Sequence, residues 1–205
     1  MTGSAFALVP VKDPARGKSR LAELLSESER LALNRELAHR TFECCAAAFG
    51  PERTVIVTAA EAMAAEASAR GLIVVRESGG GLNAALALAA RYAIGQGAGA
   101  LVVVPVDLVL LKPEALQSVI ASLMEAPGCV LVPDRHGAGT NVLGLMPARA
   151  DLFRFGERSL DKHRRAAAEA GLTVRVQTDP ALALDLDTPE DYHLWRGVGA
   201  AGSNG

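Results

Sequence analysis

The stretch Ala100-Leu101-Val102-Val103-Val104-Pro105-Val106-Asp107 decides the fold that we expect for this chain. Its apolar run, residues 100–106, is typical of a strand that a sheet buries on both faces. Strands of that kind belong to α/β sheets with helices on both faces. An acid directly after such a strand lies at its carboxyl end, where open α/β sheets bind their ligands.

Strand and helix patterns alternate along the rest of the chain. Further strands are predicted over residues 5–11, 53–58, 72–75, 129–132, 141–146 and 172–176. Helices are predicted over residues 26–49, 59–70, 82–94, 113–124 and 160–170, with a last helix from residue 188. This alternation predicts an α/β sheet with right-handed crossovers. We expect one domain over residues 1–196 and a disordered, Gly/Ala/Ser-rich tail over residues 197–205.

Composition argues against several classes of partner. The chain has 21 basic and 23 acidic residues, so no field of one sign favours nucleic acid or an anionic membrane. No apolar run approaches the roughly 20 residues that span a bilayer. The first residues lack a signal-peptide pattern, and three cysteines form neither a disulfide framework nor a zinc pattern. We therefore expect a cytoplasmic protein with reduced thiols.

A pair of acids near the C-terminus suggests a metal site. Asp185 and Asp187 stand two residues apart, so an extended backbone points both carboxylates to one side while Leu186 faces the core. Mg²⁺ prefers such oxygen ligands together with substrate phosphates. With Asp107, the pair would complete a three-carboxylate site for one or two Mg²⁺ ions. The alternative interpretation is a surface turn with solvated acids.

Two further segments suit a nucleotide. The loop of residues 12–20 follows the first strand and has four cations that could grip a triphosphate: Lys12, Arg16, Lys18 and Arg20. It is not a P-loop, because Lys12 stands where that motif requires its first glycine, six residues before Lys18. Residues 79–81 are glycines before a helix, and Asn83 could hydrogen-bond a base or a ribose. A solvated basic loop and a flexible turn are the alternatives.

Two loops suit a small anion. Residues 133–141 expose backbone N–H groups and the Thr140 hydroxyl, which fits a phosphate or a carboxylate, although a plain hairpin connection would look the same. Gly156 and Ser159 precede a helix and either hold an anionic substrate or serve as its cap. His163, one turn further, is expected to be a surface or capping histidine rather than a general base.

The sequence contains no Ser/His/Asp or Cys/His set that would serve as an activated nucleophile. Phosphoryl and nucleotidyl transfer need none, because positioning and charge neutralisation supply most of the catalysis.

Taken in order, these segments resemble the family of 2-phospho-L-lactate guanylyltransferases (CofC and FbiD proteins) of coenzyme F-420 biosynthesis. The resemblance runs from Val9 to Trp195. The matching pieces are residues 18–21, 81–86, 105–108, 133–141, Arg154-Phe155-Gly156 with Ser159 and His163, and residues 185–189. Each piece alone is weak, and their joint order is specific.

The resemblance implies a Rossmann-like fold of the nucleotide-diphospho-sugar transferase type, with a mostly parallel sheet. It implies that Mg²⁺ is held by Asp107, Asp185 and Asp187, and that the acid substrate is contacted by Thr140, Gly156 and Ser159. GTP would then be held by Lys12, Lys18, Arg20, Gly81 and Asn83. The implied acceptors are 2-phospho-L-lactate, phosphoenolpyruvate and 3-phospho-D-glycerate. A downstream lactyl-transferase and a second copy of the chain are the candidate protein partners.

The chain departs from the family pattern at two places. Val106-Asp107-Leu108-Val109 replaces the usual Ala-Asp-Leu-Pro, and Ala138 replaces a threonine near the acceptor, which puts the identity of the acceptor in doubt. Three rival functions remain open from sequence: a nucleotidyltransferase of the molybdenum-cofactor type, a glycosyltransferase, and a non-catalytic nucleotide-binding protein. The first would require a Gly-Gly-rich first loop, which Val9-Pro10-Val11-Lys12 lacks.

Overall fold

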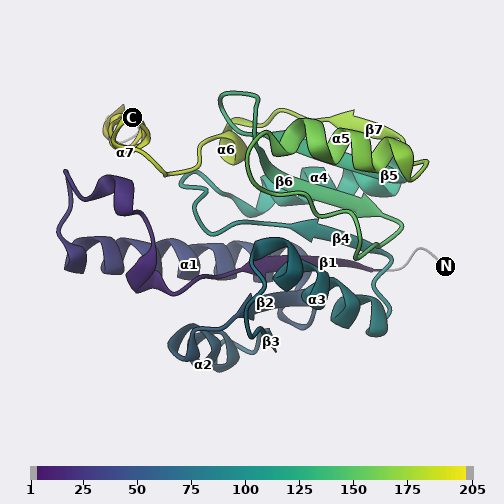
Figure 1. Ribbon diagram of the computed structural model, residues 1–205, viewed down its shortest axis with the longest axis horizontal. Coiled ribbons are helices and arrows are strands. Elements are labelled where there is room, and N and C mark those ends of the chain that lie inside the picture. Colours follow the sequence, from purple (N-terminus) through teal and green to yellow (C-terminus); the bar gives the residue numbers. More distant parts are fainter. Residues whose placement is uncertain (1–3, 202–205) are drawn as a thin grey trace.

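A single seven-stranded sheet forms the centre of the computed structural model, which describes residues 4–201 (Figure 1). The strands lie in the order β3-β2-β1-β4-β6-β5-β7. Their bounds are β1 Ala5–Pro10, β2 Thr54–Thr58, β3 Ile73–Arg76, β4 Ala100–Val103, β5 Gly128–Pro133, β6 Thr140–Met146 and β7 Val174–Val176. Only β6 runs antiparallel to its neighbours among these strands. The predicted α/β fold with a mostly parallel sheet is confirmed.

Helices cover both faces of the sheet. They are α1 Glu27–Phe49, α2 Glu61–Ala69, α3 Leu82–Gly95, α4 Pro113–Glu125, α5 Ser159–Glu169, α6 Pro180–Ala183 and α7 Pro189–Ala201, with 3₁₀ turns η1 Pro14–Arg16, η2 Ser19–Leu21 and η3 Pro51–Arg53. Helices α1, α2 and α4 pack on one face, and α3 and α5 on the other. Alternate residues of β1 serve the two cores: Ala7 and Val9 face α1, while Phe6 and Leu8 face α3.

The start of α1 shows how the sequence fixes an element. Ser26 Oγ accepts from the backbone N of Glu29 at 3.3 Å, and the Glu29 carboxylate accepts from the backbone N of Ser26 at 2.7 Å. This reciprocal capping box satisfies two N–H groups that a helix leaves free at its first turn. At the other end Gly50 takes φ 90°, and the chain leaves the helix.

Two predicted boundaries differ from the structure. The central strand β4 ends at Val103 rather than at residue 106, because Pro105 has no N–H to continue the ladder. Val104 still donates to the carbonyl of Leu8 at 3.0 Å. Helix α7 continues through Gly197 to Ala201, so the predicted start of the tail falls inside the helix; residues 202–205 lie outside the described residues.

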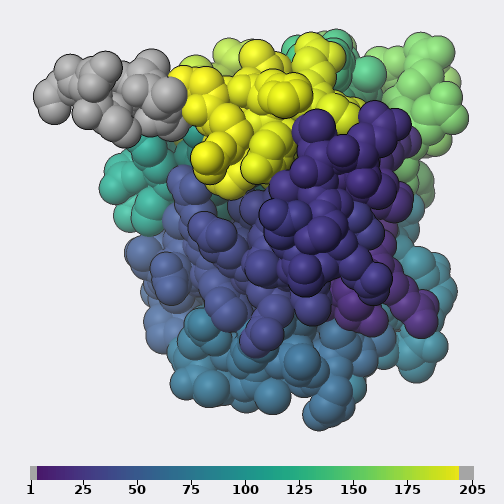
Figure 2. All heavy atoms as spheres, turned by 90° about the vertical axis from the view of Figure 1, so that its left-hand side faces the viewer, coloured from purple at the N-terminus to yellow at the C-terminus, as the bar shows by residue number. Residues whose placement is uncertain are grey.

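A third apolar cluster lies at the end of the molecule that holds the carboxyl ends of β1 and β4. Its buried members are Leu21, Leu33, Leu37, Val109, Leu184 and Leu186, and Tyr192 and Trp195 pack against them. Through this cluster, α7 and the segment before it pack against η2 and α1. Figures 1 and 2 show α7 next to the N-terminal part of the chain that holds η2. Among the described residues, no helix has both the length and the apolar character that crossing a membrane requires.

Candidate active site

Two cavities open at the carboxyl ends of β1 and β4, and Asp107 lines both. The lysine cavity, about 230 Å³, has Lys12 and Lys18 in its wall. The hydroxyl cavity, about 220 Å³, has Thr140 and Ser159 in its wall. The residues that the two linings share are Pro10, Leu82, Pro105 and Asp107. The cavities are therefore neighbours at the strand ends where α/β sheets bind ligands, and Asp107 stands between them.

A short antiparallel contact brings the predicted acids to one place. Leu108 and Asp185 form an isolated β-bridge, and the backbone N of Leu186 donates to the carbonyl of Asp107 at 3.0 Å. Asp187 then lines the lysine cavity and Asp185 the hydroxyl cavity. The loop after β4 and the segment before α7 thus hold the three acids around the boundary between the cavities.

The surroundings of the Asp107 carboxyl group disfavour its negative charge. Its Oδ1 atom is buried and has no hydrogen-bond partner among the described residues. The pKa of Asp107 is raised from 3.8 to about 6, chiefly by burial; the positive charge of Lys18 opposes this rise, and the negative charges of Asp187 and Asp185 contribute to it. A buried, unpaired carboxylate oxygen is costly, so it is a position where a cation would stabilise the protein.

Asp185 and Asp187 have different surroundings. Asn141 Nδ2 donates to Asp185 Oδ1 at 3.3 Å, and burial raises the pKa of Asp185, with the charge of Asp187 adding to the rise. The side chain of Asp187 is 52% exposed and lies 4.0 Å from Lys18 Nζ. Lys18 also donates to the carbonyl of Leu186, and only 7% of its side chain is exposed. The Lys18 ammonium group therefore partly balances the cluster of acids.

The fit of these residues to Mg²⁺ rests on Asp107. Within residues 4–201, no three His, Cys, Asp or Glu side chains already stand close enough together to hold a metal ion. The unpartnered Asp107 Oδ1 and the carboxylate of Asp187, half open to solvent, nevertheless offer oxygen ligands of the kind that Mg²⁺ prefers. These oxygen ligands are of the type that Mg²⁺ binds, and the side chains would have to rotate for the carboxylates to reach one ion.

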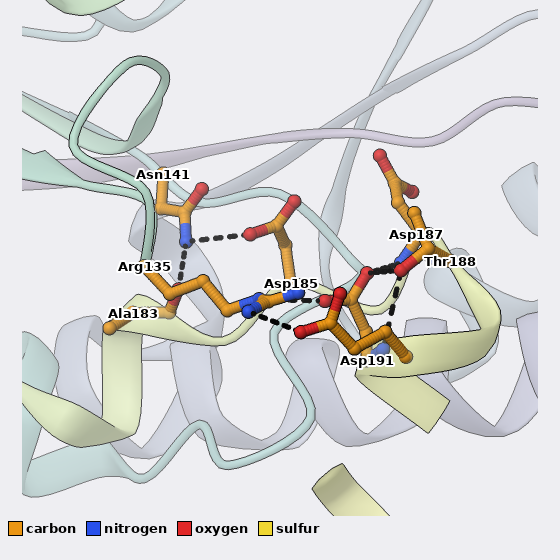
Figure 3. A network of polar contacts seen from close by, with 8 residues as sticks. Arg135, Asn141, Ala183, Asp185, Asp187, Thr188 and Asp191 are labelled. Atoms are coloured by element: carbon orange, nitrogen blue, oxygen red, sulfur yellow. Dashed lines mark hydrogen bonds and ion pairs between the residues drawn. The ribbon is translucent and has the colours of Figure 1, made fainter. Parts of the chain in front are cut away.

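A buried aspartate in α7 fixes the segment that bears Asp187 (Figure 3). Asp191, 4% exposed, accepts through Oδ2 from the backbone N of Asp187 at 3.1 Å and from the N and Oγ1 of Thr188 at 2.8 Å each. Its Oδ1 accepts from Arg135 Nε at 2.8 Å. Arg135 belongs to the loop between β5 and β6, so this ion pair joins that loop to the start of α7.

The basic loop is divided between buried and exposed cations. Lys18 takes the left-handed conformation (φ 57°), which turns its side chain inward to the acids. At Gly17 beside it, a Cβ would lie 2.7 Å from the side-chain amide nitrogen of Asn34, so a larger residue would displace that side chain. Lys12 is exposed and lines the lysine cavity, whereas Arg20 is exposed and lines neither cavity.

The three residues predicted to contact the acid substrate lie together, because Thr140, Gly156 and Ser159 all line the hydroxyl cavity. The backbone N of Thr140 donates to Ser159 Oγ at 2.9 Å, which ties β6 to the first residue of α5. His163 is 1% exposed, so the prediction of a surface or capping histidine was wrong. Its apolar surroundings come from the inward face of α5 and the ring of Phe155, 4.7 Å away between centroids.

The loop of residues 134–139 differs from the expectation of free backbone N–H groups. The carboxylate of Asp134 accepts from the backbone N of Ala138 at 2.9 Å and of Gly139 at 3.0 Å. A carboxylate inside the loop therefore occupies the donors that we expected to hold an anion. The contribution of this loop to the hydroxyl cavity comes from Asp134, Gly139 and Thr140 instead.

The glycine turn and Asn83 also differ from a direct contact with a base. Neither Gly81 nor Asn83 lines either of these two cavities, although Leu82 between them lines both. Asn83 Nδ2 donates to the carbonyl of Phe155 at 3.1 Å, and Asn83 Oδ1 accepts from the backbone N of Phe155 at 2.8 Å. The Asn83 side chain thus holds the backbone of the loop that carries Gly156, and Gly156 lines the hydroxyl cavity.

Sequence reasoning did not assign site roles to Arg135 or Asp191, and it misjudged His163. The pattern Thr188-Pro189-Glu190-Asp191 was visible as a helix start, with an acid three residues after a threonine. The ion pair with Arg135 joins residues 56 positions apart, and no local pattern indicates it.

Comparison with known proteins shows similarity to one family over most of the chain. The family model described as "Guanylyl transferase CofC like" matches residues 5–195. A phosphoenolpyruvate guanylyltransferase of Rubrobacter xylanophilus is 39% identical over 188 residues, covering 92% of this chain and 91% of that protein. A 3-phospho-D-glycerate guanylyltransferase of Colwellia psychrerythraea is 32% identical, covering 91% of this chain and 89% of the relative.

Solved structures show the same fold at low identity. A nucleotidyl transferase from Methanothermobacter superposes with a TM-score of 0.66 at 17% identity, covering 97% of this chain and 99% of that one. A Desulfovibrio desulfuricans protein assigned as a nucleotide-diphospho-sugar transferase reaches 0.70 at 18% identity, with 93% and 85% coverage. The fold is thus that of nucleotide-diphospho-sugar transferases, and by the family model and its relatives the chain belongs to the CofC-like guanylyltransferase family.

Proposed function

We propose that this enzyme transfers GMP from GTP to a phosphorylated three-carbon acid and releases pyrophosphate, as a step of coenzyme F-420 biosynthesis. The observation that carries the proposal is the pair of cavities that meet at Asp107. One has lysines suited to a triphosphate, and the other has hydroxyls suited to a small anionic acid. A group on the boundary touches both substrates where they would react.

The lysine cavity is our proposed site for the GTP phosphates, with Lys12 and Lys18 as the cations. Arg20 and Gly81 lie outside both linings, so any contact of theirs would be with parts of GTP that extend beyond the lysine cavity. Asn83 would act through the Phe155 backbone that it holds. Thr140, Gly156 and Ser159 are the proposed contacts of the acid.

We propose that Asp107, Asp185 and Asp187 hold Mg²⁺ when nucleotide is bound. The ion would supply charge neutralisation at the phosphates, which otherwise repel the approaching acid. The chain's own part is to present these carboxylates from two segments joined by the Leu108–Asp185 bridge, with Lys18 balancing their charge. This assignment predicts that binding of the ion depends most on Asp107, whose Oδ1 has no other partner in the described chain.

The reaction needs no protein base. A phosphate monoester has a second pKa near 6, so the acid substrate is mostly dianionic at neutral pH. One of its phosphate oxygens forms a bond to the α-phosphorus of GTP while the bond from that phosphorus to the bridging oxygen breaks, and pyrophosphate leaves with the electron pair. The protein's work is to align two polyanions and to offset their charge, which agrees with the absence of a nucleophile set from the sequence.

Phosphoenolpyruvate is the acceptor that we propose. The relatives from Rubrobacter xylanophilus and Sphaerobacter thermophilus, 39% and 33% identical, are named for that acceptor. The substitution at Ala138 does not count against it: Ala138 is exposed and is not part of the hydroxyl cavity lining. A hydroxyl missing there removes no donor from the cavity as it stands. The buried free thiols, Cys44, Cys45 and Cys129, fit the reducing cytoplasm that we propose as the location.

The test is pyrophosphate release from GTP and Mg²⁺ with phosphoenolpyruvate, 2-phospho-L-lactate or 3-phospho-D-glycerate supplied in turn. A downstream lactyl-transferase is included to trap a labile product. We expect release with phosphoenolpyruvate and its loss, by orders of magnitude, in Asp107→Asn. GTP binding without release for any acid would favour a non-catalytic nucleotide-binding protein, and release with another nucleotide but not GTP would favour another nucleotidyltransferase.

A further inference from the structure

His163 lies behind the hydroxyl cavity without lining it. Its Nε2 accepts from the backbone N of Arg154 at 2.9 Å, and its Nδ1 lies 3.0 Å from Thr140 Oγ1. The Phe155 ring packs edge-on against the imidazole at an interplanar angle of 72°. The ring is thus in contact with the protein on three sides.

The backbone bond decides which nitrogen of His163 carries the proton. A backbone N–H can only donate, so the Nε2 that receives it from Arg154 must be unprotonated. Burial, and to a smaller extent the charge of Arg154, lowers the pKa of His163 to about 4, so the ring is neutral at pH 7. A neutral imidazole has its one proton on the other nitrogen, Nδ1.

The protonated Nδ1 then fixes the direction of the Thr140 hydroxyl. Because Nδ1–H donates to Thr140 Oγ1, the hydroxyl hydrogen of Thr140 must point to a different acceptor. Ser159 has the same polarity, since its Oγ accepts from the backbone N of Thr140 at 2.9 Å. Both side chains line the hydroxyl cavity, so both hydroxyls are left with a hydrogen to donate to whatever occupies it.

We propose that His163 is a positioning residue for the acid substrate: it holds Thr140 as a hydrogen-bond donor into the hydroxyl cavity. The group that this arrangement recognises is one that only accepts, a carboxylate or phosphate oxygen. The inference rests on the proposed function and adds that His163 never touches the substrate and moves no proton. Its contribution is to the affinity for the acid, not to the chemical step.

Two variants separate this role from support of the loop. In His163→Asn, the amide lies where Nδ1 was, so a donor to Thr140 is kept and the acceptor for Arg154 is lost. In His163→Gln, the amide reaches the Nε2 position, so the bond from Arg154 is kept and the donor to Thr140 is lost. We expect His163→Gln to raise the KM for the acid about tenfold, a change that corresponds to the loss of one ordinary hydrogen bond. The kcat and the KM for GTP should stay nearly unchanged.

A double-variant cycle tests whether the effect passes through the hydroxyl. Thr140→Val removes the hydroxyl at nearly constant shape, and we expect the KM of Thr140→Val/His163→Gln to match that of Thr140→Val alone. Fully additive effects would overturn the proposal, as would a larger KM change in His163→Asn than in His163→Gln. If wild-type protein releases no pyrophosphate with any acid, the proposed function has failed instead.

A measurement on the unmodified protein stands beside the kinetics. Nitrogen-15 NMR of the histidine side chains distinguishes a protonated Nδ1 from a protonated Nε2 and needs neither substrate nor a variant that folds. We expect His163 to show a bare Nε2 and a protonated Nδ1 at pH 7. A proton on Nε2 would overturn the proposal, whatever the variants do.

Discussion

Replacing Asp191 with asparagine keeps the shape of the side chain and removes one negative charge from the start of α7. In the structure Asp191 is 4% exposed and accepts from four donors, at 2.8 to 3.1 Å, which come from Arg135, Asp187 and Thr188. An asparagine amide has only one acceptor atom, its oxygen. This oxygen can accept from the donors on one side, and the N–H₂ group then faces the donors on the other side. The substitution therefore removes the charge and some of the hydrogen bonds of a buried network.

The expected magnitude follows from that count. Losing a helix cap costs about 1 kcal/mol, and a hydrogen bond to a charged group is worth about 1.5–3 kcal/mol. Since the substituted amide would keep some of the bonds, we expect Asp191→Asn to lower the free energy of unfolding by about 2–3 kcal/mol. For a chain of this length that corresponds to a fall in Tm of about 4–12 °C.

Urea unfolding and a thermal melt measure the effect, and Glu190→Gln is the matched control. Glu190 contacts the same arginine at 3.2 Å from the same helical turn, but its side chain is 70% exposed. Exposed ion pairs contribute little, so the control should unfold like wild type. Equal midpoints for the two variants would refute the reasoning that Asp191 fastens the segment bearing Asp187.

The same network predicts a pH dependence. Burial alone would raise the pKa of Asp191, but its hydrogen bonds from Thr188, Asp187 and Arg135 outweigh that effect and hold the pKa below 3.8. A carboxyl group whose pKa is lower in the folded state stabilises that state above its unfolded pKa. The difference in stability between wild type and Asp191→Asn should therefore be constant near neutral pH and shrink as the pH falls below about 4.

Three further predictions concern the site. Asp107→Asn should raise the free energy of unfolding by about 1–2 kcal/mol in EDTA at pH 7.5. The pKa of Asp107 in the folded protein, about 6, lies above its unfolded value, so ionisation of this carboxyl group opposes folding as the pH rises from about 4 through 6. A variant that is less stable than wild type in urea titrations would contradict this. Lys18→Met should cut kcat by about 10²-fold, while exposed Lys12→Met should mainly raise the KM for GTP; steady-state kinetics that show the reverse would exclude the charge-balancing role of Lys18. Asn83→Ala should raise the KM for the acid about tenfold and leave that for GTP unchanged, since it releases the Phe155 backbone; a change confined to GTP would favour a direct nucleotide contact.

The parts of this protein that sequence predicted are those with a local or periodic cause. The apolar run before Asp107 identified the central strand, and the position of acids at strand ends placed Asp107 and Asp185 at one edge of the sheet. Thr140, Gly156 and Ser159 were grouped by resemblance alone, and the structure brings them into one cavity. Periodicity and punctuation therefore sufficed for the architecture, while the resemblance was needed to group the residues of the hydroxyl cavity.

The parts that sequence did not predict depend on partners distant in the chain. Nothing near Asp134 indicates that its carboxylate takes the N–H groups of Ala138 and Gly139, because the same loop could equally expose them. Asn83 suggests a ligand contact until its partner Phe155, 72 residues away, is known. Polar side chains are versatile, and only the folded geometry decides whether they serve the ligand or the protein.

The bridge between Leu108 and Asp185 has a consequence for how the enzyme is made. Strands β1 to β6 are complete by Met146, but Asp185, Asp187 and the α7 that anchors them are synthesised about 40 residues later. A nascent chain could thus bury most of its sheet while still lacking two of the three acids that we propose as Mg²⁺ ligands. Catalytic competence would arrive only after the sheet is largely built, so that a product truncated before Asp185 could fold in part without consuming GTP.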